Sequence, residues 1–186
     1  MCQNIFEYSM ICISIFLCGL SIKLLDELID ENKASYIPYM MCFLCLSLLV
    51  WKESGSLLLS SYIIGMFHDE GLKLISGLKS YSEQIIVFAL SFLLFGIYVT
   101  ISSLVIICMI QLLDDLIDVK DDIQSGKKNW VLILGKVEVI ILIFVFLLFS
   151  VYFNIFKTIV CIISTLIISY LFNKNIKLNT KMKVVS

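Results

Sequence analysis

The sequence predicts an all-α membrane protein, a polytopic bundle of about seven transmembrane helices. The chain of 186 residues is 60% hydrophobic and has a mean hydropathy of +1.02, whereas a soluble domain is about half apolar. Its apolar residues gather in long runs, and its lysines concentrate on one side of the topology that these runs define. With one Pro and no Ser/Gly-rich linker, we expect a single domain over residues 1–173 and a Lys-rich tail at 174–186.

The helices are predicted from the lengths of the apolar runs, which cover 9–25, 36–51, 56–67, 84–113, 130–154 and 158–172. A bilayer core of about 30 Å needs roughly 20 helical residues. The run at 84–113 would be about 45 Å long as one helix, which is too long for a single comfortable crossing. It contains Gly96 and the stretch Thr100–Ser103, where a tight hairpin fits, so we divide it there. Seven helices follow, several of them short, each extending past its apolar run.

The placement of lysine tests this topology, because cytoplasmic segments carry an excess of basic residues. All fourteen basic residues are lysines. With the N-terminus outside, twelve of them fall in cytoplasmic segments or near cytoplasmic helix ends, and only Lys52 and Lys157 fall outside. We therefore expect an integral membrane protein of the bacterial plasma membrane, with its C-terminus in the cytoplasm. The net charge of −1 gives no indication of a nucleic-acid partner.

Two near-identical segments, 88 residues apart, each close an apolar helix. They read IKLLDELID at Ile22–Asp30 and IQLLDDLID at Ile110–Asp118. The seven-helix topology puts both on the cytoplasmic side. This repeat indicates that the chain consists of two related halves. Many membrane proteins use such an arrangement to bring matching groups to a central site.

The aspartates of these segments are spaced for one helix face. Asp114, Asp118 and Asp122 are spaced i, i+4, i+8, and Asp26 and Asp30 are spaced i, i+4. Like charges at this spacing repel, a helix C-terminus disfavours anions, and nearby hydrocarbon adds to the cost. A bound divalent cation would remove most of that penalty, and Mg²⁺ suits it because it joins carboxylates to substrate phosphates. A solvated acidic cap is the alternative, but two copies in register favour a metal site.

The second segment and the loop behind it resemble a known family. The stretch DLIDVKDDIQSGKKNWVLILG is similar to the second aspartate-rich motif of the UbiA superfamily of intramembrane prenyltransferases, in which Asp-x3-Asp precedes a Gly, a basic residue and a second Gly. Five residues match that motif in order and spacing: Asp118, Asp122, Gly126, Lys128 and Gly135. Asp114 extends the motif one turn upstream.

The first segment departs from the family. The family's first motif is Asn-Asp-x2-Asp-x3-Asp, and Asp26 and Asp30 match its last two acids. Ile22 and Lys23 stand where the Asn and the first Asp of that motif would be. The first segment has therefore lost metal ligands relative to the family. The family usually has nine helices, and this chain resembles the middle seven.

The resemblance implies a helical bundle with a central cavity. Two Mg²⁺ ions would hold a polyprenyl diphosphate there, and its prenyl group would pass to a hydrophobic acceptor such as an aromatic ring, a quinone precursor or a lipid alcohol. Asp114, Asp118 and Asp122 would be the catalytic residues and hold one ion, and Asp26 and Asp30 would hold the other. Three lysines would contact the diphosphate: Lys23, Lys120 and Lys128.

Other interpretations stay open. A terpene cyclase would let the prenyl chain capture its own cation. A non-catalytic, degenerate isoprenoid-binding membrane protein would explain the changes at Ile22 and Lys23. A cation carrier is disfavoured, because carriers place their sites at mid-membrane and these acids lie at helix ends. A homo-oligomer is compatible with seven helices, since such a bundle can leave its cavity open on one side.

Four further residues have ordinary explanations. Cys42 and Cys45 form a C-x2-C pair, but small apolar filler in a membrane helix explains them better than a metal or redox site. The single histidine, His68, fits a polar helix end. Trp130 fits an anchor at the membrane interface.

Overall fold

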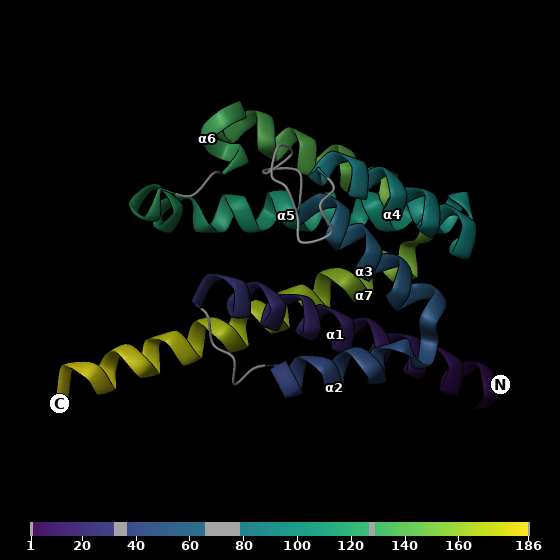
Figure 1. Ribbon diagram of the computed structural model, residues 1–186, viewed down its shortest axis with the longest axis horizontal. Coiled ribbons are helices and arrows are strands. Elements are labelled where there is room, and N and C mark those ends of the chain that lie inside the picture. The colour runs from purple at the N-terminus through teal and green to yellow at the C-terminus, as the bar shows by residue number, and fades with distance from the viewer. Residues whose placement is uncertain (1, 32–36, 66–78, 127–128, 186) are drawn as a thin grey trace. The chain divides into compact units, whose positions relative to one another are not determined.

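The computed structural model shows an almost entirely helical chain (Figure 1). It describes the backbone of residues 2–31, 37–65, 79–126 and 129–185, and the side chains of these ranges except 2–4, 26–31, 121, 125 and 173–185. The described ranges contain seven α-helices and one 3-10 turn: α1 (Cys2–Glu31), α2 (Ile37–Ser47), η2 (Leu48–Val50), α3 (Trp51–Gly65), α4 (Ser80–Phe95), α5 (Ile97–Ser125), α6 (Trp130–Leu134) and α7 (Lys136–Val185). The predicted all-α fold class is confirmed.

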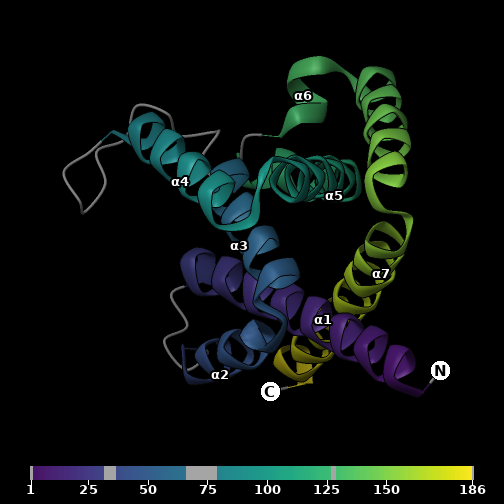
Figure 2. The same cartoon turned by 90° about the vertical axis from the view of Figure 1, so that its right-hand side faces the viewer.

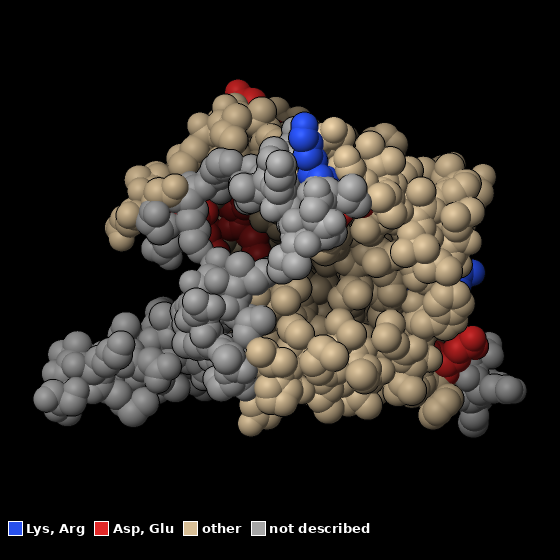
Figure 3. Space-filling model, in the orientation of Figure 1, with Lys and Arg blue, Asp and Glu red and all other residues tan. Residues whose placement is uncertain are grey.

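Four stretches of helix are long and apolar enough to cross a membrane: Ile5–Leu25, Ile37–Gly65, Ile97–Lys120 and Lys136–Phe172. α4 is a shorter apolar helix. Large apolar side chains point outward from these helices, and Leu93 is 78% and Tyr152 84% exposed. Figure 3 shows few charged side chains among the described atoms of the face in view. Such an outer surface is costly in water and favourable in lipid, so the chain is a membrane protein.

The chain forms two compact units, and residues 1–50 together with 159–186 make up the first. α1 and α2 lie side by side in it (Figures 1 and 2). The buried hydroxyl of Ser14 on α1 donates a hydrogen bond to the backbone oxygen of Ser47 at the end of α2. Gly19 lets α7 approach α1 closely, because a Cβ at this position would lie 2.9 Å from Cδ1 of Ile168.

Residues 51–158 make up the second unit. Within it, α3 packs against both α4 and α5, and α5 packs against α6. A core of three buried residues joins α5, α6 and α7: Leu112, Val131 and Val139. Leu116 and Val119 of α5 pack on that core. The core therefore fixes the end of α5 that carries the aspartates.

The long apolar run at 84–113 is broken, as predicted, but at a single residue. α4 ends at Phe95 and α5 begins at Ile97, and Gly96 between them has φ +81°. Glycine reaches positive φ without the steric penalty that a Cβ imposes. The stretch Thr100–Ser103 belongs to α5 and does not form the turn. Its Thr100 hydroxyl lies 3.1 Å from that of Ser91, which ties α5 to α4.

The other helix boundaries differ from the prediction in two places. The predicted helices at 36–51 and 56–67 are joined only by the 3-10 turn η2. The predicted helix at 130–154 is divided at Gly135, whose φ is +103°, into the short α6 and the start of α7. The predicted break after residue 154 is confirmed, because Asn154 has non-helical dihedral angles (φ −160°, ψ 95°) inside α7.

α7 runs on through the predicted tail, since its backbone is helical to Val185. Helices of one membrane domain can pack in two groups, so the division into a domain at 1–173 and a tail stays a prediction.

Candidate functional site

The acidic end of α5 is the candidate functional site. α5 continues beyond its apolar run and carries Asp114, Asp118 and Asp122 on one face. Asp118 is exposed, and Asp114 and Asp122 are partly exposed. Lys120, predicted to contact a diphosphate, is also exposed. The residues of α5 that pack on the core of the second unit lie roughly a third of a turn away round the helix, so packing leaves the acidic face accessible.

Asp115, between these acids in the sequence, has a structural role. Its side chain is 7% exposed. Its Oδ2 accepts a hydrogen bond from the backbone N–H of Trp130 at 2.9 Å, and its Oδ1 accepts one from Nε2 of Gln111 at 3.2 Å. The carboxylate thus caps the first backbone amide of α6, where a negative charge is favourable.

Asn129 joins the same network from the other side. Its side chain is 1% exposed, and its Oδ1 accepts a hydrogen bond from the backbone N–H of Val131 at 2.8 Å, which makes it the N-cap of α6. Its Nδ2 donates to the backbone oxygen of Asp115 and to Oδ2 of Asp122, both at 2.7 Å. One oxygen of Asp122 is therefore engaged in holding the turn.

Sequence reasoning missed this role of Asp115 and Asn129, although two signals were available. Asparagine directly before an apolar run is an N-cap signal. Asp115 and Asp122 are spaced i, i+7, which places them two turns apart on one side of a helix and within reach of a single side chain.

Two glycines of the predicted motif occupy positions that favour glycine. Gly126 ends α5 in the left-handed region (φ +70°), with its N–H bonded to the backbone oxygen of Asp122. Gly135 ends α6 (φ +103°), and a Cβ there would overlap the side chain of Glu138. Each glycine is thus explained by the local backbone.

The fit of Mg²⁺ to these residues is set by the spacing of the acids. Among the side chains that the structure describes, no group of three or more His, Cys, Asp or Glu residues is close enough to hold a metal ion. Asp114 and Asp122 are separated by about 12 Å along the helix axis, which is too far for both to bind one ion. One ion can therefore be held only by two acids one turn apart, such as Asp114 and Asp118. Mg²⁺ in phosphate sites usually takes one or two carboxylates, with phosphate oxygens and water completing its shell. The donor set fits that arrangement.

The remaining predicted site residues belong to other parts of the chain. Asp26 and Asp30 lie in α1, in the first unit, and their side chains are outside the described residues, as is Lys128. Lys23, also in α1, is partly exposed. His68 lies outside the described residues as well. Cys42 and Cys45 are exposed free thiols on α2. The prediction that both acidic segments share one site stays a prediction.

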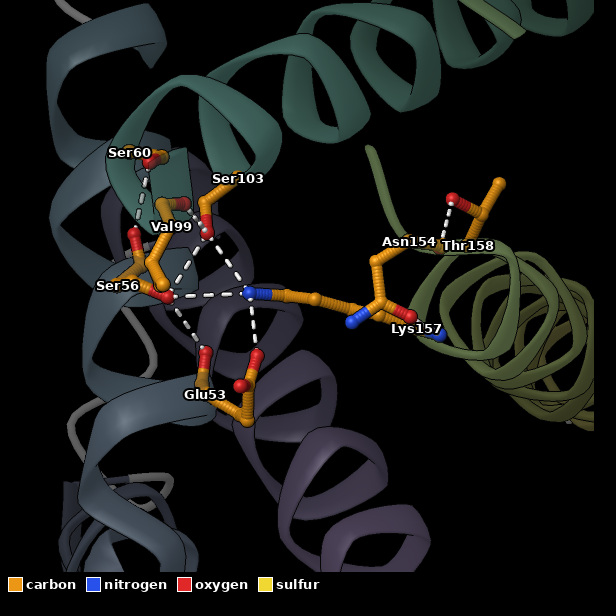
Figure 4. A network of polar contacts seen from close by, with 8 residues as sticks. All are labelled: Glu53, Ser56, Ser60, Val99, Ser103, Asn154, Lys157 and Thr158. Atoms are coloured by element: carbon orange, nitrogen blue, oxygen red, sulfur yellow. Dashed lines mark hydrogen bonds and ion pairs between the residues drawn. The ribbon is translucent and has the colours of Figure 1, made fainter. Parts of the chain in front are cut away.

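A second polar cluster was not predicted: the buried ammonium group of Lys157, which is 2% exposed (Figure 4). Its Nζ lies 2.7 Å from Oε2 of Glu53, 2.9 Å from Oγ of Ser103 and 3.2 Å from Oγ of Ser56. These partners come from α3 and α5, so the cluster joins three helices of the second unit. The sequence predicts for Lys157 only a place on the non-cytoplasmic side of the membrane.

The cluster does not test the predicted topology. Glu53, Ser103 and Lys157 fall at or near three of the predicted non-cytoplasmic connections, but the structure places them inside the helices α3, α5 and α7. Which side faces the cytoplasm stays a prediction.

Comparisons of the chain with models of protein families, with curated proteins and with solved structures found no match.

Proposed function

We propose that the protein is a Mg²⁺-dependent intramembrane enzyme that transfers a prenyl group from a polyprenyl diphosphate to a hydrophobic acceptor. The acidic face of α5 carries this proposal: Asp118 is exposed, and Asp114 and Asp122 are partly exposed, at the end of a helix long enough to cross a membrane. Such a face suits a ligand with a metal-bound anionic head and an apolar tail. The near-copy of the segment in α1 supports the proposal.

Asp114 and Asp118, consecutive acids one helical turn apart on the acidic face, would hold the metal. When bound, Mg²⁺ would stabilise the negative charge that develops on the leaving diphosphate. Lys120 would add a positive charge beside it. The apolar part of α5 would contact the prenyl tail and keep water from the reacting carbon.

In the proposed reaction, the bond between C1 of the prenyl chain and a diphosphate oxygen breaks, and its electron pair leaves with the diphosphate. The acceptor supplies the electron pair of a new bond to C1 and loses a proton to the released diphosphate. An aromatic or quinone-precursor acceptor would form a carbon–carbon bond, and a lipid alcohol would form an ether.

Binding of farnesyl diphosphate to the purified full chain in lipid nanodiscs tests the proposal. We expect binding with Mg²⁺ and none with excess chelator. The Asp118→Asn variant should bind at least about tenfold more weakly, a loss of roughly 1.4 kcal/mol. Glu7→Gln is the matched control, since Glu7 is an exposed acid at the start of α1, away from both segments. It should bind like the parent.

Binding that is unchanged without Mg²⁺ or in Asp118→Asn would contradict the proposal, as would a complete lack of binding. Magnesium-dependent binding that yields a cyclised hydrocarbon without any acceptor would identify a terpene cyclase instead. Magnesium-dependent binding without turnover of any acceptor would leave a non-catalytic isoprenoid-binding protein.

A further inference from the structure

Asp122 is an anion at a place that does not favour one. It lies on α5 one turn before Gly126, which ends the helix, and a helix C-terminus disfavours negative charge. Asp118, one turn upstream on the same face, repels it. A carboxylate in such a place has several rotamers open to it unless another group fixes it. The order of this end of the acidic face therefore depends on a hydrogen-bond donor.

Asn129 supplies that donor. Its Nδ2 donates a hydrogen bond to Oδ2 of Asp122 at 2.7 Å, a length typical of hydrogen bonds to a charged group. An amide nitrogen carries two hydrogens, and Nδ2 also donates to the backbone oxygen of Asp115 at 2.7 Å. Turning the amide over would bring its oxygen against both acceptors, so the amide has one favourable orientation.

The place of this donor is itself fixed by packing. Asn129 is 1% exposed, and its Oδ1 accepts a hydrogen bond from the backbone N–H of Val131. α6 packs on α5 (Figure 1), and Leu112 of α5 shares a buried core with Val131 of α6. All these residues belong to the compact unit of residues 51–158. Asn129 thus offers Asp122 a donor that is in place before any ligand binds.

Asp122 is the acid of this face that lies outside the proposed metal pair. It is one turn beyond Asp118, about 6 Å along the helix axis. A carboxylate has about four acceptor positions on its two oxygens, so the hydrogen bond from Asn129 does not exhaust it. Mg²⁺ keeps several water molecules when it joins carboxylates to a phosphate. The diphosphate and those waters extend beyond the ion itself, toward the neighbouring acid.

We propose that Asn129 is a positioning residue of the proposed diphosphate site. It fixes the carboxylate of Asp122 where this group accepts hydrogen bonds from the hydrated complex of Mg²⁺ and diphosphate. This inference rests on the proposed function. An acceptor that is already fixed loses little conformational entropy when the ligand binds, and groups that orient the surroundings of a metal change affinity by about 10- to 100-fold.

Binding of farnesyl diphosphate to the full chain in phosphatidylcholine nanodiscs, with Mg²⁺ present, tests the inference. The variants are Asn129→Ser, Asp122→Ala and the double variant that combines them. Serine keeps an oxygen that caps α6 but lacks the amide nitrogen that reaches Asp122, so Asn129→Ser separates positioning from capping. Circular dichroism checks that each variant is folded. Gln124→Ser is the matched control, since Gln124 is an exposed amide on α5.

We expect Asn129→Ser and Asp122→Ala each to bind about tenfold more weakly than the parent. The double variant should bind no more weakly than Asp122→Ala alone, because Asn129 acts through Asp122 and has nothing left to position. A loss of helix capping would instead add to the effect of Asp122→Ala. Gln124→Ser should bind like the parent.

The inference and the proposed function can fail separately. Binding like the parent in Asn129→Ser or in Asp122→Ala would overturn the inference and leave the proposed function in place, since that function is tested by Asp118→Asn. Additive losses in the double variant would also overturn the inference, because Asn129 would then act by a route other than Asp122. A parent chain that binds no farnesyl diphosphate would overturn both.

Discussion

At the residue scale, the turn between α5 and α6 depends on one amide side chain. Asn129 is buried, caps α6 through its oxygen, and donates through its nitrogen to Asp115 and Asp122. These contacts connect the packing of the second unit to the acidic face, because the same side chain that starts α6 also holds one carboxylate of that face. On α5, Asp115 thus has a structural role and lies between Asp114 and Asp118, for which we propose a functional role.

Replacing Asn129 by alanine should lower the free energy of unfolding by about 2–3 kcal/mol, because it removes the cap of α6 and leaves buried polar groups without their donor. Thermal unfolding in detergent, followed by circular dichroism, measures this. Gln124→Ala is the control, since Gln124 is an exposed amide on α5, and it should change stability by less than about 0.5 kcal/mol. Equal effects of the two substitutions would show that the network contributes nothing.

At the scale of elements, helix ends decide how the apolar runs are divided. Gly96, Gly126 and Gly135 have positive φ and each ends a helix, whereas the break in α7 is made by Asn154 with extended dihedral angles. The helices themselves follow from hydrophobic runs, but their exact limits follow from these four residues. This explains why the run at 130–154 yields two helices and the run at 84–113 breaks at one residue.

The two glycines of the predicted motif should differ in their tolerance of alanine. Gly126→Ala should cost about 1 kcal/mol, since the left-handed backbone opposes it and its Cβ would meet no atom of the described residues within 4 Å. Gly135→Ala should cost more, because its Cβ would also overlap Glu138. Gly65→Ala should stabilise the protein by about 0.5 kcal/mol, since Gly65 has no positive φ and, among the residues that the structure describes, none lies within 4 Å of the added methyl. The same unfolding measurement ranks all three, and a different order would contradict the account of these helix ends.

At the scale of the whole molecule, the sequence predicted what depends on local composition and missed what depends on distant packing. Apolar run lengths indicated a helical membrane protein, and the i, i+4 spacing of the aspartates indicated an acidic helix face. The Lys157 cluster was missed because Ser56 is 101 residues away from Lys157 along the chain. The burial of Asp115 depends on how α6 folds back onto α5, and the signals at Asn129 and in the i, i+7 spacing indicate a cap but not which carboxylate becomes buried.

The ion pair between Glu53 and Lys157 makes a prediction for global stability. Lys157→Met should lower the free energy of unfolding by about 3 kcal/mol, because Glu53 then stays largely buried without a partner. The double variant Glu53→Gln/Lys157→Met should be less destabilised than the single variant, since no charge is left alone. Unfolding in mixed micelles measures both. A double variant as unstable as the sum of its two single variants would mean that the two groups do not interact.

The course of α7 through both units has a consequence for biosynthesis. Chains are made from the N-terminus and tend to assemble in that order, yet α1 and α2 complete their unit only with residues after 158. While the ribosome is still adding the middle of the chain, Gly19 has no Ile168 to pack against. Residues 51–158 can assemble during that interval, so the first helices to leave the translocon are among the last to reach their final neighbours.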